Sequence, residues 1–76
     1  MIARMGKLMS RAETYARWWR RIISEYELLL SRVDQEMARE TTEEELAALR
    51  DRRASIVEKL EEARRELNRL LDARAG

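Results

Sequence analysis

The chain has 76 residues, of which 41% are charged and 45% hydrophobic, and its formal net charge is +1. It contains no cysteine and no histidine, which excludes the usual zinc, haem and iron–sulfur ligand sets, a cysteine nucleophile and a histidine base. We therefore expect no enzymatic activity, no catalytic residue, no metal site and no cofactor. No hydrophobic run approaches the about 20 residues that cross a membrane, so we expect a cytoplasmic protein.

The first part of the chain has the pattern of a long packed helix. From Met1 to Val33, hydrophobic residues alternate at spacings of four and three, which is a sustained heptad repeat. This pattern predicts a first helix over about residues 7–39. Beside the repeat runs a second hydrophobic column with a spacing of seven, formed by Ile2, Met9, Ala16, Ile23, Leu30 and Met37. A stripe of this width is typical of a helix with more than one neighbour.

The heptad repeat breaks after Ala38 and resumes at Leu46 in a shifted phase. In the polar segment between them, Thr42 and Glu45 have the spacing of a capping box. Three successive acids, Glu43–Glu45, suit the positive end of a helix dipole. The sequence therefore predicts a turn over about residues 40–42 and a second helix over about residues 43–74. The alternative is one bent helix of roughly 110 Å.

Folding the chain at this turn sets large side chains opposite small ones, as close packing requires. Trp19 would face Ala63, and Leu70 would face Ala12. The expected hairpin core consists of Leu8, Tyr15, Trp19, Ile22, Tyr26, Leu29, Val33, Leu49, Ile56, Leu60, Ala63, Leu67 and Leu70. Arg53 occupies a heptad position within this core, where we expect it either to fix the register or to pair with an acid of a neighbouring helix.

A hairpin of two helices would leave the second hydrophobic column in water. Domains this small usually need disulfides, a metal or association to be stable. Because the composition excludes disulfides and the usual metal sites, association remains. We therefore predict an all-α, two-helix antiparallel hairpin, coiled-coil-like, that dimerises into a four-helix bundle. The expected homodimer interface consists of Met9, Ala16, Ile23, Leu30, Met37, Val57 and Leu71.

The charge distribution favours an antiparallel dimer. Residues 1–21 contain six basic residues and one acid, whereas residues 22–50 contain eight acids and three basic residues. An antiparallel pair of hairpins would set each acidic turn beside a basic open end, and a parallel pair would bring like charges together.

Trp18 and Leu28 each interrupt a column that is otherwise polar. With Arg21 and Glu25 they follow one another at spacings of three and four, which places them on one face away from the expected core. Tryptophan and arginine are enriched at binding hot spots. The candidate partner-binding residues are Trp18, Arg21, Glu25, Leu28 and Arg17. The simpler interpretation is that Trp18 covers the edge of the bundle.

The leading functional interpretation is a small non-enzymatic interaction protein, a homodimer that binds a larger protein as its regulator, inhibitor, chaperone or adaptor. The alternative is a nucleic-acid-binding hairpin, because aromatic side chains among arginines can stack on bases and contact phosphates. Its candidate residues are Arg11, Arg17, Trp18, Arg20 and Arg21. A membrane surface is a less favoured partner, because binding it would compete with burial of the same helix face in the bundle.

The predicted architecture resembles small helical-hairpin dimers such as the Rop-type RNA binders of plasmids. It also resembles the short hairpin chaperones and inhibitors that bacteria and phages direct against larger proteins. The resemblance lies in chain length and heptad repeats over the whole chain, so no functional residue is transferred from these families.

Overall fold

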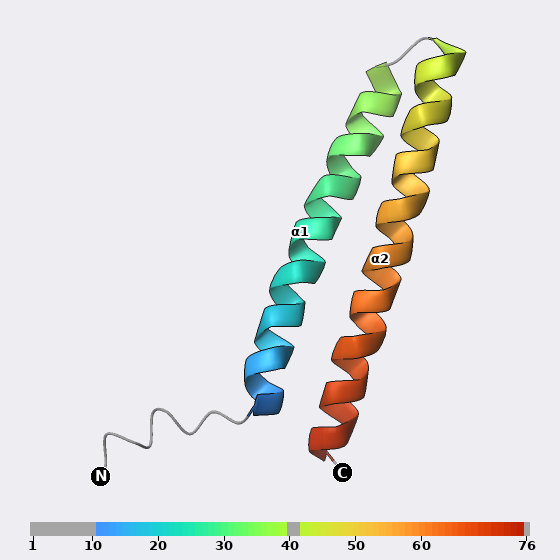
Figure 1. The fold of residues 1–76 in the computed structure, drawn as a ribbon. Helices are drawn as coiled ribbons and strands as arrows, with labels where there is room; N and C mark the ends of the chain where they lie inside the picture. Colours follow the sequence, from blue (N-terminus) through green and yellow to red (C-terminus); the bar gives the residue numbers. More distant parts are fainter. Residues whose placement is uncertain (1–10, 40–41, 76) are drawn as a thin grey trace.

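Residues 11–39 and 42–75 are described by the computed structural model, with side chains described as far as Ala73. They form two α-helices, α1 (Arg11–Arg39) and α2 (Glu43–Ala75). The helices lie side by side and antiparallel, so that α1 begins and α2 ends at the same end of the molecule (Figure 1). We call this the open end and the opposite one the turn end. The molecule measures 62 × 25 × 12 Å. The all-α hairpin is therefore confirmed, and the single bent helix is wrong.

Thr42 caps the N-terminus of α2. Its Oγ1 accepts a hydrogen bond from the backbone N–H of Glu45 at 3.3 Å, and its carbonyl oxygen accepts one from Leu46 N–H at 3.0 Å. The three acids Glu43–Glu45 occupy the first turn, where the helix dipole stabilises negative charge. The capping contact expected of Thr42 is thus present, and it satisfies a backbone donor that the start of a helix leaves unpaired.

The core is a narrow line of contact between the two helices, which we call the seam. Among the described residues, five hydrophobic side chains are buried there: Ala16, Val33, Ile56, Leu60 and Ala63. Six further members of the expected core are half-buried: Trp19, Ile22, Tyr26, Leu49, Leu67 and Leu70. The expected core residue Leu8 lies outside the described residues. Ala16 and Ala63 are each only 1% exposed, so both small side chains lie fully within the seam.

The seam of α1 is rotated relative to the expected one. Tyr15 and Leu29, which the heptad pattern placed in the core, are 52% and 41% exposed, so the expectation is wrong for both. Ala16, expected at a dimer interface, is instead buried within the hairpin. The physical reason is size. The methyl group of Ala16 lets the helices approach closely, whereas the ring of Tyr15 would hold them apart.

Ion pairs from α2 arginines to α1 acids cross the seam. Arg53 Nε lies 2.7 Å from Asp34 Oδ1, and Arg64 Nη2 lies 2.8 Å from Glu27 Oε2. In both pairs the arginine is farther from the turn than the acid, because side chains tilt toward the N-terminus of their own helix. The expected pairing of Arg53 with an acid of the neighbouring helix is confirmed. These side chains are about half exposed, so each pair contributes about 1 kcal/mol or less and chiefly helps to set the register.

Candidate functional site

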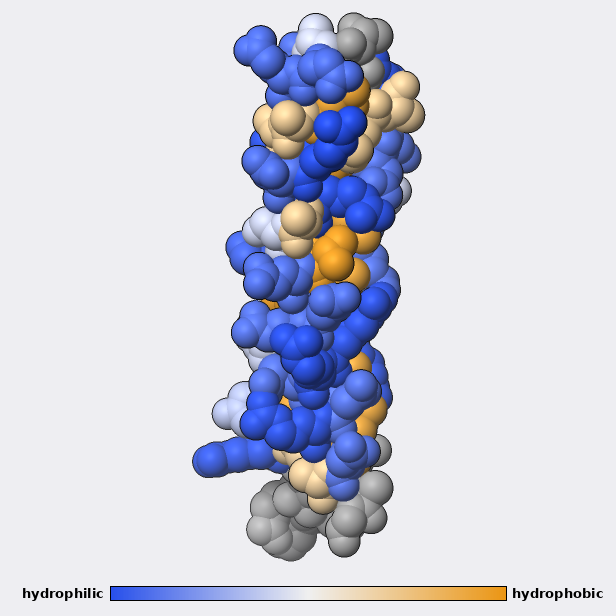
Figure 2. Space-filling model, turned by 90° about the vertical axis from the view of Figure 1, so that its right-hand side faces the viewer, coloured by the Kyte–Doolittle hydropathy of each residue, from blue (hydrophilic) through white to orange (hydrophobic). Residues whose placement is uncertain are grey.

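The exposed hydrophobic surface is concentrated on one helix. Within the described part of the chain, the large hydrophobic side chains that remain exposed are Tyr15, Trp18, Leu28 and Leu29, and all four belong to α1. Figure 2 views the molecule from the side of α2, whose surface is mostly hydrophilic, with hydrophobic side chains at its edges and in the gaps. Contiguous exposed hydrophobic surface is unusual for a monomer and marks interaction sites. The candidate site is therefore the exposed surface of α1.

Two groups of residues make up this surface. Tyr15, Ile22 and Leu29 recur every seven positions, so they stand in one line beside the seam, which we call the α1 column. Farther from α2 lie the five expected partner-binding residues, which we call the outer face. The outer face consists of Arg17, Trp18, Arg21, Glu25 and Leu28.

Every residue of the outer face is exposed to solvent. The ring of Trp18 packs edge-on against Trp19, with ring centroids 4.8 Å apart and planes at 69°. Arg21 Nε lies 3.6 Å from Glu25 Oε2, one turn farther along the helix. This ion pair is too exposed to contribute much stability. The outer face therefore presents one positioned aromatic ring, one hydrophobic side chain, a pair of opposite charges and the additional basic side chain of Arg17.

The expected dimer-interface residues lie on the opposite flank of the seam. Ile23, Leu30, Met37, Val57 and Leu71 are half-buried there, and Met9 lies outside the described residues. The ion pairs Arg53–Asp34 and Arg64–Glu27 cross this flank. Leu30 lines a shallow hollow together with Glu27, Leu60 and Arg64. Each of these five side chains is individually less exposed than Tyr15 or Leu29 of the α1 column.

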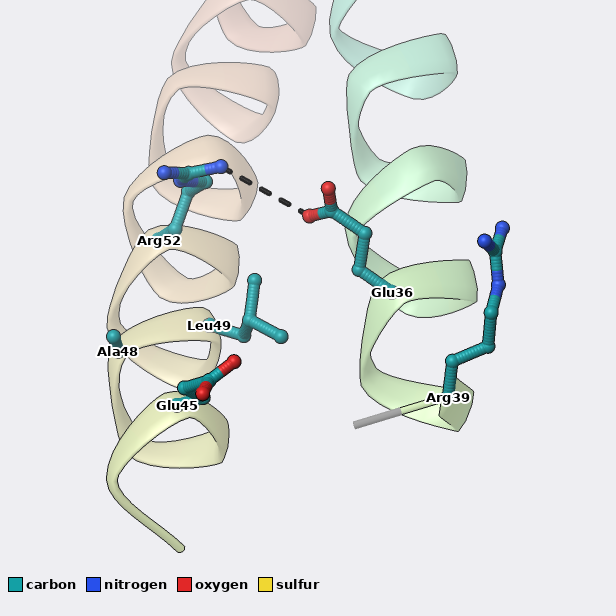
Figure 3. A pocket seen from close by; sticks show the side chains of 6 residues that line it. All are labelled: Glu36, Arg39, Glu45, Ala48, Leu49 and Arg52. Carbon is teal, nitrogen blue, oxygen red and sulfur yellow. Dashed lines mark ion pairs between the residues drawn. The ribbon is translucent and has the colours of Figure 1, made fainter. Parts of the chain in front are cut away.

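A second shallow hollow lies between the helices near the turn end. Glu36 and Arg52 face each other across it at 4.0 Å (Figure 3), and its lining is completed by Arg39, Glu45, Ala48 and Leu49. Its charged side chains carry both signs and remain open to solvent. In residues 11–39 and 42–75 there is no group of three or more acids positioned to hold a metal ion. Neither described helix is long and hydrophobic enough to cross a membrane.

The residues of the nucleic-acid alternative are exposed but do not share one face of α1. Arg11 and Arg20 are separated by about two and a half helical turns, so they point in opposite directions. Arg21 is paired with Glu25. A single-stranded nucleic acid is usually held by a continuous basic groove with aromatic rings along it. The arginines of α1 are instead spread over more than one face of the helix.

The sequence interpretation missed the exposure of Tyr15 and Leu29. The sequence signal that could have revealed it is the small side chain of Ala16, next to Tyr15. An alanine fits between two closely packed helices better than a tyrosine does. Comparisons with protein families, with curated proteins and with solved structures give no match for this chain.

Proposed function

We propose that this chain is a small non-enzymatic interaction module: a helical hairpin that forms a homodimeric four-helix bundle and binds a larger protein as a regulator, inhibitor, chaperone or adaptor. The observation that carries the proposal is the location of the exposed large hydrophobic side chains of the described residues, all of them on α1. A lone hairpin buries little hydrophobic surface, and domains of this size gain stability by association when they lack disulfides and metals.

The larger protein would be recognised by the outer face. Trp18 and Leu28 supply hydrophobic surface, and Arg21 with Glu25 supplies charge at its rim. The contact with Trp19 already orients the ring of Trp18, so less conformational freedom is lost when a partner covers it. Buried tryptophans surrounded by weaker contacts are the usual source of binding energy at protein interfaces.

The experiment starts with affinity capture from an extract of the native host, using the wild-type chain as bait. The captured protein is purified and titrated with wild type, Trp18→Ala and Leu28→Ala, and Arg65→Ala on the exposed surface of α2 serves as the matched control. We expect Trp18→Ala to weaken binding at least about 30-fold, which corresponds to roughly 2 kcal/mol. Circular dichroism should show unchanged helicity. Equal affinities for all four proteins would contradict the role of the outer face.

Nucleic-acid binding is the second candidate, supported by the exposure of Arg17, Arg20 and Arg21 around the exposed ring of Trp18. Ionic strength separates the two candidates. An affinity for single-stranded oligonucleotides that falls steeply with added salt would favour the nucleic-acid role, because phosphate binding releases condensed counterions. A partner bound mainly through hydrophobic surface should show a much weaker dependence on salt.

A further inference from the structure

The α1 column is a line of hydrophobic side chains that α2 leaves uncovered. Tyr15 and Leu29 are exposed, and Ile22 between them is half-buried. On the opposite flank of the seam, two ion pairs join the helices and the hydrophobic side chains are already half-buried. Tyr15 and Leu29 are therefore the most exposed of the large hydrophobic side chains described beside the seam, and association would cover both.

We propose that the α1 column is the self-association surface, and that it is covered by the α1 column of a second copy running in the opposite direction. This inference rests on the proposed function, because it specifies which surface joins the two hairpins. It replaces the interface expected from the sequence, in which Ala16 was one of seven members.

The α1 column is symmetric about its midpoint, which suits pairing with a second copy of itself. Tyr15 and Leu29 each stand two helical turns from Ile22, on opposite sides of it. A two-fold axis through Ile22 would bring Ile22 against Ile22 of the second copy and Tyr15 against Leu29 of the second copy. Each column would then meet its own complement, as the interface of a two-fold dimer requires.

The charges along α1 also favour an antiparallel second copy. Residues 11–21 carry four arginines and one acid, whereas residues 22–39 carry four acids and two arginines. Glu27 and Asp34 are paired with α2 arginines on the opposite flank, so Glu25 and Glu36 are the acids on the side of the α1 column. The two-fold axis through Ile22 sets the basic part of one α1 against the acidic part of the other. A parallel pair would place like charges together, which costs association energy.

The two ends of the column carry charges of opposite sign. Glu36 follows Leu29 by seven residues and so continues the column toward the turn end, while Arg11 lies one turn before Tyr15. Under this two-fold axis Arg11 stands opposite position 33 of the second copy, between Arg32 and Glu36, of which Glu36 continues the α1 column. Among the described residues, the ion-pair contact of Glu36 is a long one of 4.0 Å with Arg52, so its carboxylate can take a second cation.

Cysteine crosslinking tests the arrangement, because the chain has no cysteine of its own. Ile22→Cys should form a disulfide-linked dimer by itself under mild oxidation. A mixture of Tyr15→Cys and Leu29→Cys should give the mixed dimer at least about ten times as often as either like pair, since only facing positions meet disulfide geometry. Leu28→Cys is the matched control, because Leu28 is equally exposed but lies on the outer face. Mass spectrometry identifies the linked chains, and sedimentation of the wild type gives its mass in solution.

The other possible results separate a failure of this inference from a failure of the proposed homodimer. A wild-type mass of one chain, near 9.1 kDa, would overturn both this inference and the proposed homodimer. A dimer that crosslinks through Ile23→Cys or Leu30→Cys but not through the α1 column would overturn the inference and keep the homodimer. Efficient crosslinking of Tyr15→Cys with itself, at the expense of the mixed pair, would overturn the antiparallel arrangement.

Discussion

Ala16 and Tyr15 are adjacent in the sequence, yet Ala16 is buried between the two helices and Tyr15 faces solvent. One residue corresponds to a rotation of about 100° around a helix axis, so this pair defines how α1 is turned against α2. The rotation places the α1 column beside the seam rather than inside it. It thereby provides the hydrophobic surface on which the proposed self-association depends.

Close packing at Ala16 predicts that enlarging this side chain destabilises the hairpin. Ala16→Leu should lower the free energy of unfolding by about 1–3 kcal/mol, because the added atoms cannot be accommodated between closely packed helices. The same substitution at the exposed Ala54 on α2 should change stability by less than about 0.5 kcal/mol. Thermal melts monitored by circular dichroism compare the two variants. Similar melting temperatures would contradict the observed seam.

The cap of α2 predicts a loss of stability in Thr42→Ala. Removing Oγ1 leaves the backbone N–H of Glu45 without its side-chain acceptor, which should cost about 1 kcal/mol. Thr42→Ser keeps the hydroxyl group and should retain most of the wild-type stability. Urea denaturation of the three proteins measures the difference, and an equal loss in both variants would show that the methyl group matters rather than the hydrogen bond.

The ion pair between Arg53 and Asp34 predicts a small coupling energy that is sensitive to salt. Both side chains are about half exposed, so a double-mutant cycle with Arg53→Ala and Asp34→Ala should give a coupling of about 0.2–1 kcal/mol. The coupling should decrease in 1 M salt, where the Debye length is about 3 Å. A coupling that exceeds about 2 kcal/mol and resists salt would indicate a desolvated pair instead.

The two neighbouring tryptophans predict unequal effects on folding. Trp19 is half-buried against α2, and Trp19→Ala should cost roughly 2 kcal/mol, about half the value for a fully buried tryptophan. Trp18→Ala removes an exposed ring and one aromatic contact, which corresponds to about 1 kcal/mol. Chemical denaturation of both variants tests the order. A larger loss for Trp18→Ala would assign Trp18 to the packing of the bundle and not to a partner-binding surface.

Several features were predictable because they depend on local chemistry. The heptad repeat, the polar break and the capping residues Thr42 and Glu45 can be recognised from the sequence alone, because helix formation and capping depend on residues that are close together in the chain. The exposure of Trp18 and Leu28 also followed from the sequence, because each is the single hydrophobic member of a polar column.

Only the tertiary structure decided which hydrophobic column enters the seam. Ala16, Ile23 and Leu30 form one column, Tyr15, Ile22 and Leu29 form the other, and both flank the same central line of α1. Periodicity treats the two columns alike, because they have the same spacing and differ by a single position. The choice depends on how closely α2 can approach, which is a property of two helices together. A methyl group at Ala16 permits that approach and the ring of Tyr15 opposes it, so Ala16 is buried in the seam and Tyr15 is exposed, while Ile22, Ile23 and Leu30 are half-buried.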